Sequence, residues 1–200
     1  MLDIGSGTGY FLNKMKEHKW LVTGVEKSDG TRLYAKQKFD IDTQVSDYLY
    51  EIAPESKDVI TMWHVLEHLE KLDDVMSKIV NIVKDEGTIL IALPNKDSLD
   101  ASHYKEYWAA YDVPRHLWHF SPSDFEQLTN KYKLELIEMK PMYFDVFYIS
   151  MLSEKNKGTL LGSVIGLCKG FIFYLRSIGK VEKCSSVVYI LKKKSKNNIR

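Results

Sequence analysis

Apolar positions follow two alternating spacings along most of the chain. Near-continuous apolar runs, such as residues 88–93, predict strands buried on both faces of a sheet. Apolar residues that recur every three or four positions, as in 67–84, predict helices with one buried face. We expect strands over residues 1–4, 21–26, 41–45, 58–63, 88–93, 134–139 and 187–191, and helices over 10–15, 31–38, 67–84 and from Ser121 onward. This alternation predicts a doubly wound α/β fold.

Two irregular stretches interrupt the alternation, at residues 96–120 and 141–185. Neither is a low-complexity linker, so we predict a single domain over residues 1–200 with two insertions. Because they follow the fifth and sixth predicted strands, we expect both to form a substrate cap at the strand ends. The first strand is short, with only Met1 to Ile4 before a turn, whereas strands commonly have about five residues. We therefore expect a longer natural N-terminus, so that this sheet is N-terminally truncated.

The first turn contains three glycines, at positions 5, 7 and 9 of the segment DIGSGTG. Glycine adopts positive φ angles readily and lets a ligand come close to the backbone. The spacing differs from the G-x-G-x-x-G fingerprint of dinucleotide sites, because residue 10 is tyrosine. An NAD-dependent oxidoreductase is the alternative enzyme class, and this difference in glycine spacing disfavours it. A P-loop is excluded, because no Gly-Lys-Ser/Thr follows the glycines.

The segment DIGSGTG closely resembles motif I of the class I S-adenosylmethionine (SAM)-dependent methyltransferases. The resemblance continues in order through VTGVEKS, DVITMWHVLEHL and GTILIALPN, and PRHLWHFSPSDFEQL is similar to a bacterial subgroup that acts on small molecules. It implies a Rossmann-like, mostly parallel sheet of seven strands with an antiparallel last strand. It also implies SAM as the cofactor, with Glu26 accepting hydrogen bonds from the ribose hydroxyls and Asp47 near the adenine amino group.

The matched motifs imply a SAM site at the ends of the first four strands. The cofactor-binding residues expected on this basis are Asp3, Gly5, Ser6, Gly7, Gly9, Glu26, Lys27, Asp47, Tyr48, Met62, Trp63 and His64. His64 to His68 also fits H-x-x-E-H, a zinc-protease pattern. Zinc needs a third protein ligand, and the resemblance accounts for the same residues without metal, so we expect none. A non-catalytic SAM-binding module is a further alternative.

A candidate base lies in the first insertion. Methyl transfer from a sulfonium is an in-line displacement, in which the enzyme chiefly positions two reactants. A hydroxyl acceptor must also lose its proton, and histidine titrates in the useful range. His116 and His119 lie among aromatic residues, which equally serve to close a domain by packing. We predict His116 as the general base for O-methylation of a small, largely apolar, hydroxylated acceptor.

The composition of the chain limits which binding partners and which cellular compartment we expect. Twenty-eight basic and 27 acidic residues give a net charge of +1, which provides no reason to expect nucleic acid as a partner. The two cysteines, Cys168 and Cys184, lack the spacing of metal ligands and suit a reducing compartment. We therefore expect a cytoplasmic protein, whose oligomeric state the sequence does not decide.

Residues 159–175 form the most apolar stretch of the second insertion. Glycines at 162, 166 and 170 have the spacing of packed membrane helices, yet the stretch contains Lys169 and is short for a span of about 20 residues. We favour an amphipathic helix of the cap. Contact with a membrane surface, as part of a membrane-associated protein, is the alternative.

Overall fold

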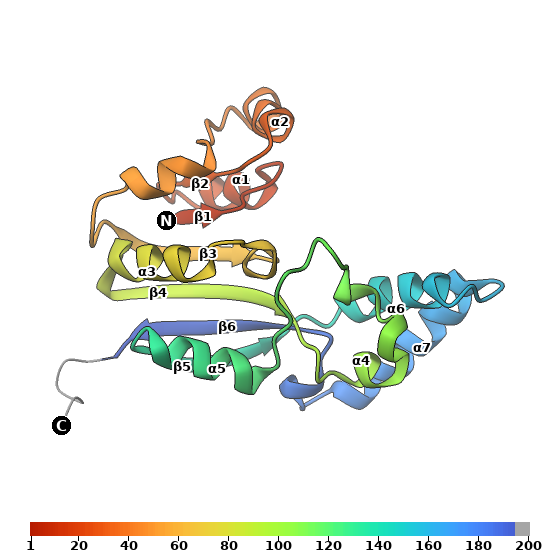
Figure 1. The fold of residues 1–200 in the computed structure, drawn as a ribbon. Coiled ribbons are helices and arrows are strands. Elements are labelled where there is room, and N and C mark those ends of the chain that lie inside the picture. The colour runs from red at the N-terminus through yellow and green to blue at the C-terminus, as the bar shows by residue number, and fades with distance from the viewer. Residues whose placement is uncertain (195–200) are drawn as a thin grey trace.

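The computed structural model describes residues 1–194 and contains a six-stranded sheet with helices on its faces (Figure 1). The strands are β1 (Leu2–Ile4), β2 (Thr23–Val25), β3 (Lys57–Trp63), β4 (Val83–Pro94), β5 (Leu134–Pro141) and β6 (Ser186–Lys193). Their spatial order is β2-β1-β3-β4-β6-β5, and the pairs among β1 to β4 are parallel. The last strand, β6, is antiparallel to both β4 and β5. The predicted doubly wound fold with an antiparallel last strand is confirmed.

Four helices belong to the layers beside the sheet: α1 (Tyr10–Glu17), α2 (Asp29–Phe39), α3 (Leu72–Ile82) and α5 (Pro122–Lys131). Figure 1 shows α3 and α5 in front of the same face of the sheet. The apolar stripe of α3 is buried there, through Leu72, Val75, Met76, Ile79 and Ile82. Ser121 caps α5, because its hydroxyl accepts from the Asp124 N–H while the Asp124 carboxylate accepts from the Ser121 N–H.

The described residues form six strands, so the expectation of seven was wrong. Residues 41–45 make a single bridge, in which the Gln44 N–H donates to the Gly24 carbonyl at 2.8 Å and the Gln44 carbonyl accepts from the Glu26 N–H at 2.9 Å. The ladder ends there because the chain turns after Val45 into the 3-10 helix η1 (Ser46–Glu51).

The helix expected over 67–84 is also shorter than predicted. A 3-10 turn, η2 (Leu66–His68), precedes α3, and residues from Val83 onward already belong to β4. The reason lies in the backbone of Val83, which is extended, with ψ at 138°. Val83 is therefore buried beside the apolar residues of α3, but it belongs to a strand rather than to the helix.

Both insertions contain helices of their own and lie beyond the strand ends on one side of the sheet (Figure 1). The first holds α4 (Leu99–Tyr104), η3 (Lys105–Tyr107) and η4 (Ala109–Tyr111), and the second holds α6 (Asp145–Asn156), α7 (Gly162–Ser177) and η5 (Val181–Lys183). They share a small apolar core made of Ala101, Tyr104, Trp108, Ala110, Val146, Ile149 and Phe173. Two stretches far apart in the sequence thus form one packed unit.

The glycine stripe of α7 packs against α6. A Cβ atom on Gly166 would lie 2.5 Å from Cα of Met151, and one on Gly170 would lie 3.0 Å from Cα of Phe147. The two helices therefore approach each other at backbone distance along these glycines. The opposite face of α7 is apolar and exposed. Within residues 1–194, no helix combines the length and the hydropathy required to cross a membrane.

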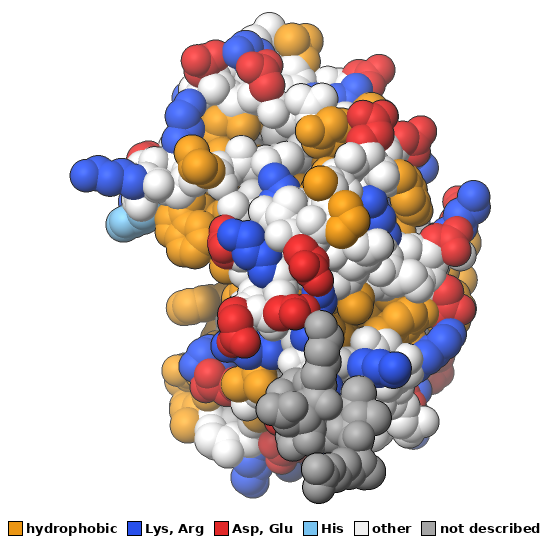
Figure 2. Space-filling view, turned by 90° about the vertical axis from the view of Figure 1, so that its left-hand side faces the viewer, with side chains coloured by type: hydrophobic (Ala, Val, Ile, Leu, Met, Phe, Trp, Pro, Cys, Tyr) orange, Lys and Arg blue, Asp and Glu red, His pale blue; other side chains and the backbone are white. Residues whose placement is uncertain are grey.

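The face of the molecule opposite the insertions carries both signs of charge. Figure 2 shows Lys and Arg side chains interspersed there with Asp and Glu, and with small apolar patches between them. This surface matches the near-neutral net charge of +1.

Candidate active site

The order of the strands reverses at β1, and two loops meet at this switch point. β1 lies between β2 and β3, and ligands of doubly wound sheets bind beyond the carboxyl ends of the strands at such a point. The loop after β1 holds Gly5, Gly7 and Gly9, whose φ angles are 69°, 52° and 81°. A Cβ atom on Gly5 would lie 2.4 Å from Cγ2 of Val65, in the loop after β3. The two loops are therefore in direct contact.

Gly7 is the open position of the glycine loop. A Cβ atom on Gly9 would lie 2.9 Å from Cβ of Ala35 in α2, whereas one on Gly7 would meet no atom within 4 Å. Gly9 is thus a packing residue, while the backbone of Gly7 faces unfilled space. Free space over a backbone with positive φ suits a ligand that approaches the chain closely.

Glu26 follows β2 and braces the glycine loop with its carboxylate. Its Oε2 accepts a hydrogen bond from the Gly7 N–H at 3.0 Å, and its Oε1 accepts one from the Ser28 N–H at 2.9 Å. Each carboxylate oxygen retains further acceptor capacity, which a pair of ribose hydroxyls can use. Lys27 lies beside it and is exposed. The structure therefore brings Glu26 and the glycine loop together.

Asp3 lies buried beneath the loop and is 1% exposed. Its Oδ1 accepts a hydrogen bond from the Thr61 hydroxyl of β3 at 2.6 Å. Burial raises the pKa of Asp3 to about 7, against the opposing effect of that hydrogen bond. Ser6 is also buried, and its hydroxyl has no hydrogen-bond partner within residues 1–194. Asp3 thus ties β1 to β3, and its contact with the cofactor stays a prediction.

The other predicted cofactor residues flank the loop on both sides. Asp47, which is exposed, and Tyr48, which is half-buried, lie in η1, which packs against β2. On the β3 side, Met62 is fully buried and Trp63 packs edge-on against Phe11, with ring centroids 5.2 Å apart. The buried indole N–H of Trp63 lacks a partner in the described part of the chain. These residues border the ends of β2 and β3, and their contacts with the cofactor stay predictions.

His64 begins the loop after β3 and carries a positive charge between two carboxylates. Its φ angle of 55° is a conformation that residues other than glycine adopt only at a cost in energy. Its Nε2 lies 3.1 Å from Oδ2 of Asp145, the first residue of α6, and its Nδ1 lies 3.4 Å from Oε1 of Glu67. Burial opposes the charge, but the two carboxylates outweigh burial and raise the pKa of His64 to about 9. The charge therefore stabilises the folded chain fully below about pH 6.5, and this contribution is lost as the pH rises through about 9.

Asp145 was not among the site residues predicted from the sequence, although it is the strongest partner of His64. Burial acts to raise the pKa of its carboxyl group, but the neighbouring imidazolium holds that pKa below its usual range. The two residues are 81 positions apart, and no motif marks the segment around Asp145. Only the packing of α6 beside the strand ends brings them together.

A cavity of about 310 Å³ opens between the His64 loop and the two insertions. Polar side chains line one part of it, namely His64, Glu67, Asp112, Arg115, His116 and Asp145. Residues of α6 supply an apolar wall through Tyr148, Ile149 and Leu152. A mostly apolar wall with a few convergent polar groups is typical of a small-molecule site. Because His64 belongs both to this cavity and to the loop beside Gly5, the cavity adjoins the predicted cofactor site.

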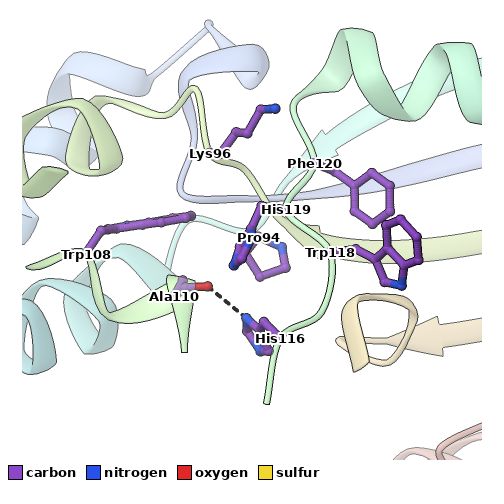
Figure 3. Close-up of a pocket in the computed structure, with 8 residues that line it drawn as sticks. All are labelled: Pro94, Lys96, Trp108, Ala110, His116, Trp118, His119 and Phe120. Carbon is purple, nitrogen blue, oxygen red and sulfur yellow. Dashed lines mark hydrogen bonds between the residues drawn. The ribbon is translucent and has the colours of Figure 1, made fainter. Parts of the chain in front are cut away.

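His116 is held as a neutral imidazole at the wall of this cavity. Its Nδ1 lies 2.8 Å from the Ala110 carbonyl, which can only accept, so Nδ1 carries the proton and Nε2 carries the lone pair (Figure 3). Burial lowers the pKa of His116, although the carbonyl contact opposes this. In His119, by contrast, Nε2 donates to the Tyr111 carbonyl at 2.8 Å. Figure 3 shows both histidines in a second, smaller pocket that Trp108 also lines.

Comparison with known proteins places this chain in a family. Residues 1–139 match the family model described as a methyltransferase domain. A ubiquinone biosynthesis O-methyltransferase of Idiomarina loihiensis is 25% identical, across 78% of this chain and 70% of that protein. The chain belongs to the class I SAM-dependent methyltransferases, and SAM is its cofactor. The dinucleotide-dependent alternative is therefore not supported.

Solved structures show the same fold. A SAM-dependent methyltransferase of Archaeoglobus fulgidus superposes with a TM-score of 0.61 at 21% identity, over 96% of this chain and 85% of that one. A phosphoethanolamine N-methyltransferase 2 of Haemonchus contortus in complex with SAM gives a TM-score of 0.63 at 24% identity, over 98% of this chain. The present chain covers 48% of the Haemonchus protein.

The prediction that Glu26 accepts hydrogen bonds from the ribose hydroxyls is tested by removing its carboxylate. Glu26→Ala should weaken SAM binding by roughly 1–3 kcal/mol, about 5- to 150-fold in Kd, because it removes charged acceptors and the brace on Gly7. Calorimetric titration with SAM measures this. Glu17→Ala, at the end of α1 where Glu17 pairs only with neighbouring side chains, is the control and should bind as the parent does. Parental affinity in a folded Glu26→Ala variant would show that Glu26 does not hold the ribose.

Proposed function

We propose that this enzyme transfers the methyl group of SAM to a hydroxyl oxygen of a small, largely apolar acceptor bound in the cavity beside His64. The observation that carries the proposal is a neutral histidine, His116, at the wall of a cavity whose α6 side is apolar. A hydroxyl needs a proton acceptor within reach, and an apolar wall favours an apolar ligand. The two insertions, which share one small core, form the substrate cap.

The open space over Gly7 and the acceptor oxygens of Glu26 support a SAM site at the switch point. Bound SAM supplies an electrophilic methyl group on a sulfonium. The unfilled space at Gly7 and the acceptors of Glu26 would hold the nucleoside, with Asp47 at the adenine amino group. The loop of Trp63 and His64 would border the methionine end, next to the cavity. The chain's contribution is to orient the acceptor oxygen toward this loop and to exclude water.

His116 is the group proposed to take up the acceptor proton. Its Nε2 bears the lone pair, and its lowered pKa keeps the ring neutral at pH 7. When the acceptor oxygen attacks, the O–H proton would pass to Nε2. Glu67 and Asp112 favour the imidazolium that forms, because both act to raise the pKa of His116. The proton thus stays near two carboxylates until it leaves for water.

The similar Idiomarina loihiensis protein is named for O-methylation in ubiquinone biosynthesis, which supports an oxygen acceptor. The apolar wall of the cavity supports a largely apolar compound with one nucleophilic hydroxyl, such as a quinol-like or lipid-linked molecule. The two free cysteines agree with a reducing compartment, so we assign the enzyme to the cytoplasm.

We further propose that α7 and its flanks contact an anionic membrane surface. The outward side of this region exposes apolar side chains at Leu160, Leu161, Val164, Ile165, Leu167, Phe171, Ile172, Leu175 and Ile178. Between residues 155 and 183 the chain has six basic residues, Lys155, Lys157, Lys169, Arg176, Lys180 and Lys183, of which Lys169 is paired with Glu154 at 2.6 Å. Glu182 is the acidic residue in that range. Apolar side chains with a basic surround are typical of helices that lie in the interface of anionic lipids.

The proposed base predicts a pH dependence of the reaction. The assay measures the rate of methyl transfer from labelled SAM to an apolar phenol in the presence of a chelator. This rate should decrease as the pH is lowered, with an inflection below pH 6.5. The reason is that protonated His116 cannot accept a proton and that its pKa is lowered. His116→Gln should reduce kcat by roughly 10²- to 10⁴-fold and remove this inflection, with SAM affinity unchanged. An unchanged rate and pH profile in His116→Gln would rule out this role.

The membrane contact predicts selective binding to charged vesicles. The protein should co-sediment with vesicles containing phosphatidylglycerol, much less with pure phosphatidylcholine, and less again at high salt. Leu167→Glu together with Phe171→Glu should abolish binding, whereas Leu33→Glu, an exposed residue of α2, should not. Equal binding by the double variant, or dimer formation through α7 without vesicle binding, would contradict the contact.

A further inference from the structure

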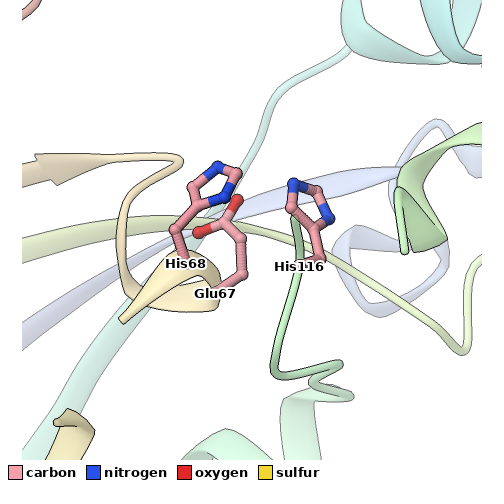
Figure 4. A group of neighbouring side chains, drawn as sticks. All are labelled: Glu67, His68 and His116. Carbon is pink, nitrogen blue, oxygen red and sulfur yellow. The ribbon is translucent and has the colours of Figure 1, made fainter. Parts of the chain in front are cut away.

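Glu67, His68 and His116 form a cluster that the proposed methyl transfer uses only in part. Glu67 and His68 lie in the η2 turn, and His116 lies in the first insertion, nearly fifty positions later. One ligand atom from each residue lies within 4.8 Å of the others. Figure 4 shows the three side chains converging from the two segments. The rings of His68 and His116 meet edge-on, with centroids 4.5 Å apart.

Both imidazoles are oriented by backbone carbonyls. Nδ1 of His68 lies 3.0 Å from the Arg115 carbonyl, and Nδ1 of His116 lies 2.8 Å from the Ala110 carbonyl. A carbonyl only accepts, so each Nδ1 carries the proton and each Nε2 is left as a lone pair. An outer hydrogen bond from the second ring nitrogen to a carbonyl is the arrangement of histidines that bind metals.

The third residue is a buried carboxylate that lacks hydrogen bonds. Glu67 is 1% exposed, and neither of its carboxyl oxygens has a hydrogen-bond partner within residues 1–194. Nδ1 of His64 lies 3.4 Å from Oε1 of Glu67, whereas Oε2 has no hydrogen-bond partner in the described part of the chain. Leaving a buried carboxylate oxygen unpaired costs free energy, which a bound cation offsets.

The two segments are also fastened together at this point. The Glu67 carbonyl accepts hydrogen bonds from the N–H groups of Leu117 at 2.8 Å and Trp118 at 3.2 Å. The η2 turn and the segment after His116 are therefore held in fixed register before any ligand arrives. Such preorganisation lowers the cost of assembling a site from distant parts of the chain.

We propose that Glu67, His68 and His116 bind a divalent transition-metal ion, for which zinc is the best match. Two imidazoles and one carboxylate, with a further position open to solvent or substrate, are the ligands of many catalytic zinc sites. Zinc bonds of 2.0–2.1 Å place tetrahedral ligands roughly 3.4 Å apart, so the cluster must contract on binding. The exposed ring of His68 leaves room for this movement.

This site differs from the H-x-x-E-H pattern in the sequence. That pattern pairs His64 with His68, but the imidazolium of His64 is engaged by Asp145 at 3.1 Å. His116 takes its place as the second imidazole. Asp112 is close, with Oδ2 3.8 Å from Nε2 of His116, but its other oxygen pairs with Arg115. We therefore assign three protein ligands.

The proposed zinc site and the proposed function compete for one group, because both use the Nε2 lone pair of His116. Bound zinc would supply a Lewis acid at the cavity wall. The metal-free chain would instead leave Nε2 available as the base. Loading the site with zinc should therefore remove the pH inflection assigned to His116.

Zinc binding is tested without any methyl acceptor, so its outcome is independent of the proposed reaction. The purified chain, first treated with a chelator and then dialysed, is titrated with zinc against a chromogenic chelator. One equivalent should bind, and His68→Ala, His116→Ala and Glu67→Gln should each weaken binding by more than about 10-fold. His103→Ala is the matched control, because His103 lies near Lys169 in the other part of the insertions, and it should bind zinc as the parent does.

His68 is exposed, so His68→Ala should fold even if a variant of the buried Glu67 does not, and it then decides the test. SAM affinity and thermal melting of each variant report whether the fold is intact. If folded His68→Ala binds zinc as tightly as the parent, or if the parent takes up no stoichiometric zinc, the site does not exist. If zinc binds as described but the metal-free protein, assayed with a chelator, shows no methyl transfer, the metal site stands and the proposed reaction does not.

Discussion

His64 carries its charge between Asp145 of α6 and Glu67 of its own turn, and the cavity that we propose for the acceptor is arranged around this contact. Asp145 belongs to the second insertion, so the ion pair ties that insertion to the end of β3. The Glu67 carbonyl, in turn, holds the Leu117 and Trp118 segment of the first insertion. Both side chains of this pair are only half-buried, so removing one partner leaves the other charge uncompensated but still partly solvated. Both insertions thus depend on one turn.

The cofactor side depends on the same turn in another way. Val65, the residue after His64, packs against Gly5, where no side chain would fit. The glycine loop therefore sits directly on the loop that carries His64. On its other flank, Glu26 fixes the loop through the Gly7 N–H. The cavity for the acceptor and the predicted SAM site are consequently adjacent, as an in-line transfer between two bound molecules requires.

The sequence predicted that the glycine loop and Glu26 lie together, because their determinants are local, and their contacts with SAM stay a prediction. Three glycines within five residues, and a carboxylate directly after the next strand, keep their spacing whatever the rest of the chain does. The prediction of a seventh strand was wrong for a local reason as well. After one bridge at Gln44 the chain turns into η1, and the apolar run at residues 41–45 does not reveal this turn.

The acceptor side was less accessible from sequence, because it is made of contacts between distant segments. His64 and Asp145 are 81 positions apart, and no periodicity links them. The cluster of Glu67 with His116 likewise arises only when the first insertion folds back over the η2 turn. His116 was predicted from its residue type and its aromatic surroundings. Its tautomer is set by the Ala110 carbonyl, a contact that the sequence does not reveal.

We infer that the His64–Asp145 contact shapes the proposed acceptor cavity and that the predicted SAM site does not depend on it. Asp145→Ala tests it most directly, with SAM affinity measured by calorimetry and methyl transfer measured on the same preparation. We expect a SAM Kd within about 2-fold of the parent and a transfer rate lowered by about 10-fold or more, since a tenfold change needs only 1.4 kcal/mol. A loss of SAM affinity as large as the loss of transfer, or a transfer rate equal to that of the parent, would contradict it.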